Sequence, residues 1–179
     1  MVRVVAIVLM VVSLGLQGCI ASGVAGLKSY VNSYNGYEFL YPNGWSEVKV
    51  QNGPDVVLHD LIEETENVSV IVSPVPDGKT LEELGTPSEV GYKLSKNAIA
   101  PPDSGREADL ISASSRQVGA NTHYILEYAV KLPNQERHNL ASVAVRRGQL
   151  FTLNLSTTEK RWEKLRERFQ IVVNSFNVY

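Results

Sequence analysis

The chain has 179 residues, a length typical of a single globular domain. Its composition, 44% hydrophobic and 20% charged, excludes an intrinsically disordered chain. The formal net charge of −2 disfavours nucleic acid as a partner, because proteins that bind nucleic acid carry basic patches. A single cysteine excludes an intramolecular disulfide and any metal site built from several cysteines.

The N-terminus has the pattern of a bacterial export signal. Arg3 precedes an apolar run at residues 4–12, which is too short for a transmembrane helix. The run leads into Leu16-Gln17-Gly18-Cys19, which resembles the lipobox of bacterial lipoproteins, and Cys19 is the single cysteine. We therefore predict a signal peptide at residues 1–18, which is removed, and lipidation of Cys19. The alternative is a buried cysteine in a plain signal or anchor helix.

Small and polar residues follow Cys19, with glycine at 23 and 26 and serine at 29 and 33. This composition predicts a lipidated, flexible tether at residues 19–35. Such a tether would let the domain work at a membrane surface without touching lipid. We expect the folded domain to occupy residues 36–179.

Alternating apolar residues and turn residues predict four strands in the first half of this domain. Aromatic residues alternate in the first strand, at residues 37–41, and Pro42-Asn43-Gly44 forms a turn. The next segment, residues 45–50, is predicted as the return strand. The third and fourth strands are expected at residues 55–62 and 67–75.

The middle of the chain predicts helices and then strands again. A short helical turn at residues 81–84 ends at Gly85. Thr86-Pro87-Ser88-Glu89 then combines a capping threonine, a proline at the first helical position and a glutamate three residues after the cap, which marks a helix start. Strands are predicted at residues 107–116 and 122–132.

The C-terminal part predicts a hairpin followed by a helix. Two apolar runs, residues 140–145 and 150–155, flank Arg146-Arg147-Gly148-Gln149. In each run, the residues expected on either face of the strand are largely apolar. This pattern indicates strands that are covered on both faces. Ser156, three residues before Glu159, predicts a capping box. An apolar stripe at helical spacing follows, made of Trp162, Leu165, Phe169, Val172 and Phe176.

Together these elements predict an α+β fold. Short hairpin connections make the central sheet mainly antiparallel, and strands that are apolar on both sides require helices on both faces. We therefore expect a three-layer α/β/α sandwich.

The sequence offers few sites for chemistry. It contains neither a glycine-rich phosphate loop nor a G-x-S-x-G motif, and we predict that the protein is not an enzyme. His59 and Asp60 lie close to three glutamates, a ligand set that suits Zn²⁺, Mn²⁺ or Ca²⁺, although adjacent residues of a strand point to opposite faces. The alternative is a solvated acidic turn.

The hairpin suggests a second metal candidate and a partner site. With the turn at residues 146–149, residue 138 lies opposite 156 or 157, so His138 comes close to Glu159. This pair could bind metal or form a simple contact at the edge of the sheet. Arg146 and Arg147, at the hairpin tip, are candidates for contacting an acidic partner. The basic residues of the last helix interleave with glutamates and are expected to form its solvated face.

These residues give the chain a resemblance to the PsbP family, in particular its cyanobacterial branch, because of the lipobox. The resemblance covers most of the chain after Cys19. It rests on the motifs Asn35-Gly36-Tyr37-Glu38-Phe39-Leu40-Tyr41-Pro42, Gly44-Trp45, Gly53-Pro54-Asp55-Val56-Val57, Asn67-Val68-Ser69-Val70, Gly85-Thr86-Pro87-Ser88-Glu89, Arg137-His138-Asn139-Leu140, Gly148-Gln149-Leu150-Phe151 and Lys160-Arg161-Trp162.

The resemblance implies a non-enzymatic, extrinsic lipoprotein on the lumenal side of the thylakoid membrane, anchored through the lipid on Cys19. Its implied partners are photosystem II subunits or assembly intermediates, and its role is to aid assembly or stability of the oxygen-evolving complex. Family members have been linked to Zn²⁺, Mn²⁺ or Ca²⁺, and a histidine and aspartate proposed for metal fall on His138 and Glu159 here. The alternative is a lumenal metal carrier that is not stably bound to photosystem II.

Overall fold

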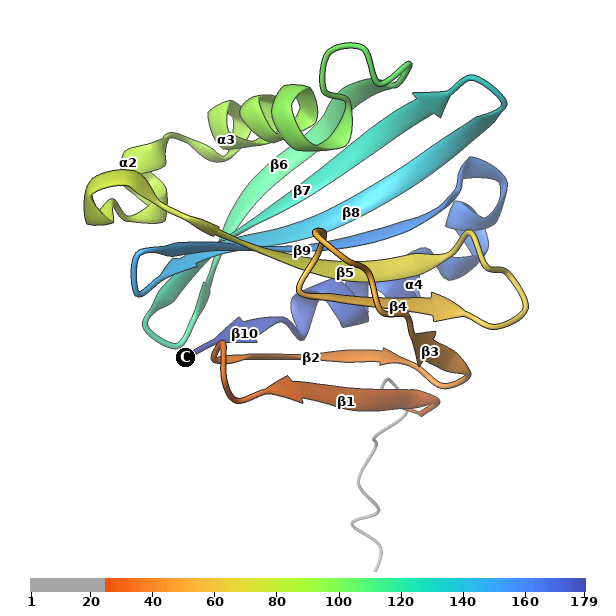
Figure 1. Cartoon of the computed structure of the whole chain (residues 1–179), viewed down its shortest axis with the longest axis horizontal. Helices are drawn as coiled ribbons and strands as arrows, with labels where there is room; N and C mark the ends of the chain where they lie inside the picture. Colours follow the sequence, from red (N-terminus) through yellow and green to blue (C-terminus); the bar gives the residue numbers. More distant parts are fainter. Residues whose placement is uncertain (1–24) are drawn as a thin grey trace, which may run out of the picture.

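The computed structural model describes residues 25–179, and their strands form two antiparallel sheets (Figure 1). The larger sheet has seven strands in the order β3-β4-β5-β9-β8-β7-β6, and the smaller has the order β1-β2-β10. The strands are β1 Leu27–Asn32, β2 Tyr37–Pro42, β3 Trp45–Glu47, β4 Val56–Asp60, β5 Asn67–Pro74, β6 Glu107–Val118, β7 Asn121–Leu132, β8 Gln135–Arg146, β9 Gln149–Thr158 and β10 Asn177–Val178.

The helices lie on opposite faces of the larger sheet. They are α2 Leu81–Leu84, α3 Pro87–Leu94 and α4 Glu159–Asn174; a 3₁₀ turn, Pro76–Gly78, precedes α2, and a π-helical turn, Ser95–Ile99, follows α3. Both α2 and α3 begin with complete capping boxes, at Thr80 and Thr86, because each threonine is followed three residues later by a glutamate that reaches back to it. The capping signal at Thr86 is therefore confirmed.

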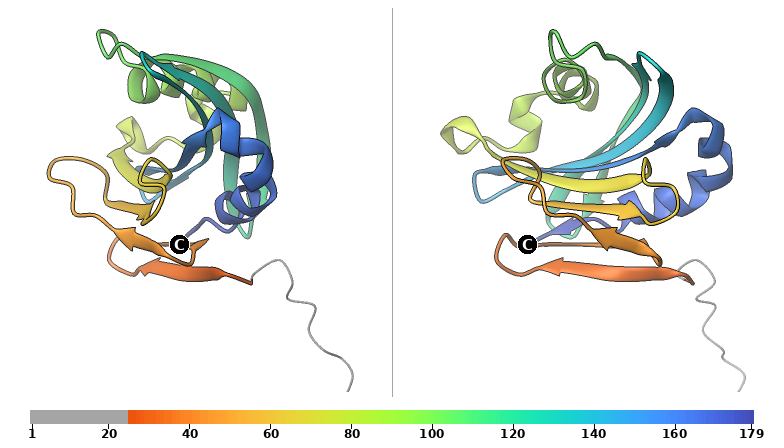
Figure 2. Two further views of the ribbon diagram at one scale, coloured as in Figure 1. Left: turned by 90° about the vertical axis from the view of Figure 1, so that its right-hand side faces the viewer. Right: turned by 45° about the vertical axis from the view of Figure 1, so that its right-hand side comes forward.

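Figure 2 shows the layers edge-on, and two hydrophobic cores hold these layers together. In the first core, α4 and the smaller sheet pack against one face of the larger sheet, through Phe169, Val172 and Phe39 among others. In the second, α2 and α3 pack against β6, β7 and β8, through Leu81, Val90 and Leu126. The predicted α+β fold with a mainly antiparallel sheet covered by helices is confirmed, and the smaller sheet is an addition that shares its layer with α4.

The register of the last hairpin agrees with the prediction. Arg146 pairs with Gln149, so Arg147 and Gly148 alone form the turn, with φ values of +52° and +70°. Two left-handed residues in a row are typical of the type I′ turn, whose twist matches that of the strands. His138 consequently pairs with Thr157, at one of the two predicted positions.

The predicted tether is wrong in its C-terminal part. Leu27–Asn32 forms β1, which pairs with the whole of β2. The segment was predicted as a tether because most of its residues are small or polar. Two of its apolar side chains, Leu27 and Tyr30, nevertheless pack against the first core. The folded part therefore begins before residue 36, while the predicted signal peptide and the predicted lipidation site Cys19 lie outside the described residues.

Residues 45–50 do not return along β2. Only Trp45–Glu47 is a strand, and it pairs with β4 in the larger sheet. The indole of Trp45 explains this exchange of sheets: it packs edge-on against Phe169 of α4, and its Nε1 donates to Asp60 at 2.9 Å. Burial of this side chain fixes β3 beside β4.

The predicted capping box at Ser156 is also wrong. β9 continues to Thr158, which occupies the N-cap position of α4 without a side-chain hydrogen bond. Ser156 instead donates to Asn139 Oδ1 at 2.6 Å, within the sheet. None of the helices within residues 25–179 combines the length and apolar character needed to span a bilayer.

Candidate functional site

His138 lies at the centre of a polar cluster between β8 and α4. Its Nδ1 is 3.0 Å from Glu159 Oε2, and its Nε2 is 2.8 Å from Glu127 Oε1 on β7. The ring is buried and stacks on the indole of Trp162, with 3.9 Å between centroids and 11° between planes. The predicted proximity of His138 and Glu159 is confirmed, whereas Glu127 was not predicted.

Both ring nitrogens of His138 are engaged by carboxylates. Each nitrogen lies within hydrogen-bond distance of a glutamate oxygen, so neither is free to bind a metal ion while these contacts are kept.

This arrangement does not fit a metal centre. A metal on either ring nitrogen would have to displace a carboxylate, and the two carboxylates lie on opposite sides of the ring. Across residues 25–179, no three His, Cys, Asp or Glu side chains converge in a way that could hold a metal ion. The cluster is better described as a charged brace that connects β7, β8 and the first turn of α4.

His59 and Asp60 do not come together. They are neighbours on β4, so their side chains lie on opposite faces of the sheet. The Asp60 carboxylate accepts hydrogen bonds from the backbone N–H groups of Ile62 and Glu63, and from Trp45 Nε1. These bonds, of which that from Glu63 has the largest effect, lower the pKa of Asp60. Asp60 thus shapes the β4–β5 turn and is not placed as a ligand beside His59.

Arg146 and Arg147 lie exposed at the tip of the β8–β9 hairpin. With Lys79 they line a hollow of about 280 Å³ beside the start of α2. No salt bridge within residues 25–179 involves these three cations. Their charge is therefore available to an acidic surface.

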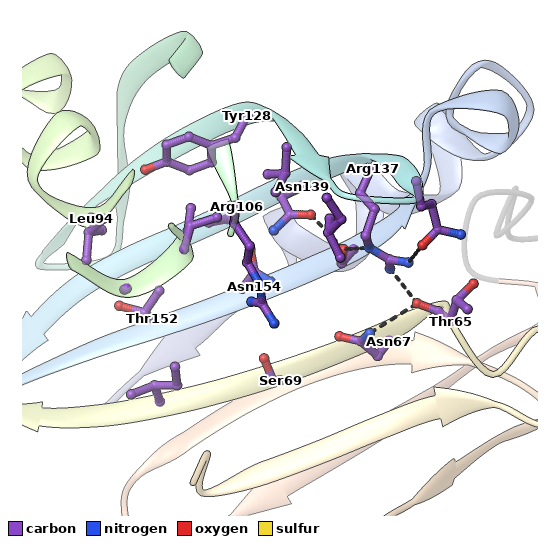
Figure 3. Close-up of a pocket in the computed structure, with 18 residues that line it drawn as sticks. Thr65, Asn67, Ser69, Leu94, Arg106, Tyr128, Arg137, Asn139, Thr152 and Asn154 are labelled. Carbon is purple, nitrogen blue, oxygen red and sulfur yellow. Dashed lines mark hydrogen bonds between the residues drawn. The ribbon is translucent and has the colours of Figure 1, made fainter. Parts of the chain in front are cut away.

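A larger pocket, which the sequence patterns did not predict, lies on the opposite face of the sheet from α4 (Figure 3). It has a volume of about 390 Å³, with β5, β9 and β8 as its floor and the end of α3 as one wall. The β9 side chains on this floor are Thr152, Asn154 and Ser156. The expectation that β9 is apolar on both faces is therefore wrong. Only the face that carries Phe151, Leu153 and Leu155 is apolar.

Comparison with known proteins identifies the family. The profile of the family described as PsbP matches residues 25–178. A protein named CyanoP from Thermosynechococcus vestitus is 53% identical over 97% of this chain and 96% of its own length. CyanoP from Synechocystis sp. is 45% identical over 98% of this chain and 95% of its own length.

A solved structure agrees with this assignment. The solution structure of cyanobacterial PsbP (CyanoP) from Synechocystis sp. PCC 6803 is 45% identical and superposes with a TM-score of 0.75, covering 92% of this chain and 99% of that chain. The predicted resemblance is confirmed at the level of sequence and of fold. The chain belongs to the PsbP family.

Proposed function

We propose that this protein is a lipid-anchored, non-enzymatic, extrinsic protein of the lumenal face of the thylakoid membrane that aids assembly or stability of photosystem II. The observation that carries the proposal is the similarity to the two CyanoP proteins over 97% and 98% of the chain. Coverage this complete supports a shared role for the domain, and the anchor is proposed from the lipobox Leu16-Gln17-Gly18-Cys19 of this sequence.

The geometry favours a binding role over catalysis. The most polar buried cluster, around His138, is satisfied internally by two carboxylates and covered by Trp162. The exposed cations of the β8–β9 turn, by contrast, face solvent without carboxylate partners among the described residues. We assign Arg146 and Arg147 to contact an acidic lumenal surface of photosystem II. Charge complementarity of this kind raises association rates and falls with ionic strength.

Affinity purification tests the proposal. The full chain with a C-terminal tag would be expressed in a cyanobacterium that lacks its own relative, and recovered from gently solubilised thylakoids. We expect photosystem II subunits or assembly intermediates to be enriched over a control lipoprotein that carries the same signal peptide and anchor.

Two variants separate the anchor from the docking surface. Cys19→Ser is expected to shift the protein from the membrane to the soluble fraction. Arg146→Gln with Arg147→Asn should leave the protein at the membrane but weaken the enrichment, since asparagine tolerates the left-handed turn. Equal recovery of photosystem II with the tagged protein and the control lipoprotein would refute the proposal.

A further inference from the structure

The pocket behind α3 is built from an unusual set of side chains for the face of a β-sheet. Eighteen residues line it, and none of them is acidic, while two are arginines, Arg106 and Arg137. Glu66, the acidic residue that acts on the pKa of Arg137, does not line the pocket and is engaged by Arg161 and Thr157. The lining of the pocket therefore carries two positive charges and no negative one.

Arg137 is the centre of this charge. Its side chain comes from β8, and the residue is only 9% exposed. Nε donates to Ser156 at 3.0 Å, Nη1 to Gln135 at 3.1 Å, and Nη2 to the carbonyl of Thr65. All of these acceptors are neutral, and they use three of the five N–H groups of a guanidinium.

A buried cation whose direct hydrogen-bond partners are all neutral is incompletely compensated. Burial lowers the pKa of Arg137, with Glu66 opposing the effect and Arg106 adding to it. An anionic ligand that uses the two remaining N–H groups would supply the missing compensation.

A second unsatisfied group lies in the middle of the pocket. Asn154 Oδ1 is buried and has no hydrogen-bond partner within the described residues. Figure 3 shows Asn154 near Arg106, between Leu94 and Thr152 on one side and Arg137 and Thr65 on the other. A ligand can satisfy this amide either by donating to Oδ1 or, after rotation of the amide, by accepting from Nδ2.

The opposite end of the pocket is apolar. Leu94, Ala98 and Ile99 project from the end of α3 and the π-helical turn, and Ile71 faces them from β5. The ligand therefore needs a charged end at Arg137 and an apolar body of a few carbon atoms. A volume of about 390 Å³ lies in the range that holds small molecules.

We propose that this pocket binds a small organic monoanion, a carboxylate attached to a short apolar chain. The planar carboxylate matches the planar fork of the Arg137 guanidinium, Arg106 closes over the charge, and the apolar chain lies along the end of α3. This site lies on the face of the sheet opposite the His138 cluster and does not depend on the association with photosystem II.

Titration with octanoate, followed by ¹H–¹⁵N NMR, tests the proposal. The protein would be residues 19–179 with Cys19→Ser, because both cores consist of residues after Gly26 and the solved relative, which covers 92% of this chain, is folded in solution. We expect saturable shifts of the Asn139 and Asn154 side-chain amides and of the backbone amides of residues 94–99. Acetate, which lacks the chain, and 1-octanol, which lacks the charge, should bind at least about tenfold more weakly.

An exposed arginine supplies the matched pair of variants. Arg106→Gln removes charge from the pocket without disturbing a buried side chain, and should weaken octanoate binding about tenfold. Arg166→Gln, on α4 and the opposite face, should leave it unchanged. The proposal is overturned if 1-octanol or acetate binds as well as octanoate, if Arg106→Gln has no effect, or if no saturable shift appears at the pocket.

Discussion

His138 and the two carboxylates that it contacts, Glu127 and Glu159, show how residues of metal-ligand type can serve the fold. The imidazole is buried against Trp162 and connects two strands with a helix that lacks a side-chain cap. Glu159 lies in the first turn of α4, where the helix dipole favours a negative charge. The cluster therefore ties the start of α4 to β7 and β8 through side chains.

His138→Ala should lower the free energy of unfolding by about 2 kcal/mol, because it leaves two carboxylates without their partner and removes the stack on Trp162. Glu159→Gln, at a half-exposed position, should cost less than about 1 kcal/mol. Urea denaturation with and without Zn²⁺ measures both effects. A Zn²⁺-dependent stabilisation of the native protein that disappears in His138→Ala would contradict the brace.

His123 is the residue through which acid should destabilise the fold. It is fully buried, and desolvation, aided by Arg116, lowers its pKa from 6.5 to about 4. Between these two pH values the unfolded chain binds a proton at His123 and the native protein does not. Stability should therefore fall as the pH drops from about 6.5 to about 4, by about 1.4 kcal/mol per pH unit.

Urea denaturation between pH 6.5 and 5 checks this dependence, because Asp60, Glu82 and Glu89, whose pKa values are lowered, contribute at more acid pH. His123→Gln should flatten the profile whatever its effect on stability at neutral pH. An unchanged slope in that variant would assign the acid sensitivity to other groups.

Some of these residues could be predicted from the sequence and others could not. The hairpin turn determined which residue faces His138, so its proximity to Glu159 followed from register alone. Glu127 needed the register of the hairpin between β7 and β8, which the sequence patterns did not determine. Arg137 and Asn154 were not predicted as site residues. The apolar residues of β8 and β9 indicated core strands, and the polar residues that alternate with them gave no signal of a pocket.

The position of α3 depends on close approach to the sheet. Tyr128 donates from its hydroxyl to the carbonyl of Gly91 at 3.0 Å, and a Cβ at Gly91 would lie 2.9 Å from the methyl groups of Leu110. α3 can pack this close to the sheet because residue 91 has no side chain. Leu94, at the end of the same helix, lines the pocket.

Gly91→Ala should therefore destabilise the protein by about 1 to 3 kcal/mol, although alanine is the better helix former. Ser88→Ala, at an exposed position of the same helix, is the control and should be within about 0.5 kcal/mol of the native protein. Denaturant midpoints at constant slope measure both. A more stable Gly91→Ala variant would show that α3 can move away from the sheet at no cost.

At the level of elements, local patterns predicted most strands and helices and the pairing of β8 with β9, but neither the existence of β1 nor the partner of β3. Trp45 changed sheets because its indole is buried against Phe169, a contact between distant segments that no local pattern records. β1 was not predicted, because its composition is mostly polar and its stability comes from pairing with β2. Tertiary contacts overrode local composition in both cases.

The two candidate surfaces lie apart on the molecule. One end of the larger sheet carries the exposed turn of Arg146 and Arg147, with Lys79 beside it. The pocket of Arg137 lies along the face of the larger sheet behind α3 (Figure 1). In the proposed function, the basic turn contacts a membrane complex and the pocket remains accessible.

The central claim is that the exposed turn of Arg146 and Arg147 contacts photosystem II. Crosslinking in isolated thylakoids tests this contact most directly. An amine-reactive crosslinker followed by mass spectrometry should join Lys79 to a lumenal part of a photosystem II subunit. The yield should fall severalfold in Arg146→Gln with Arg147→Asn. Crosslinks from Lys79 to other complexes alone, or a yield that is unchanged in the double variant, would contradict the account.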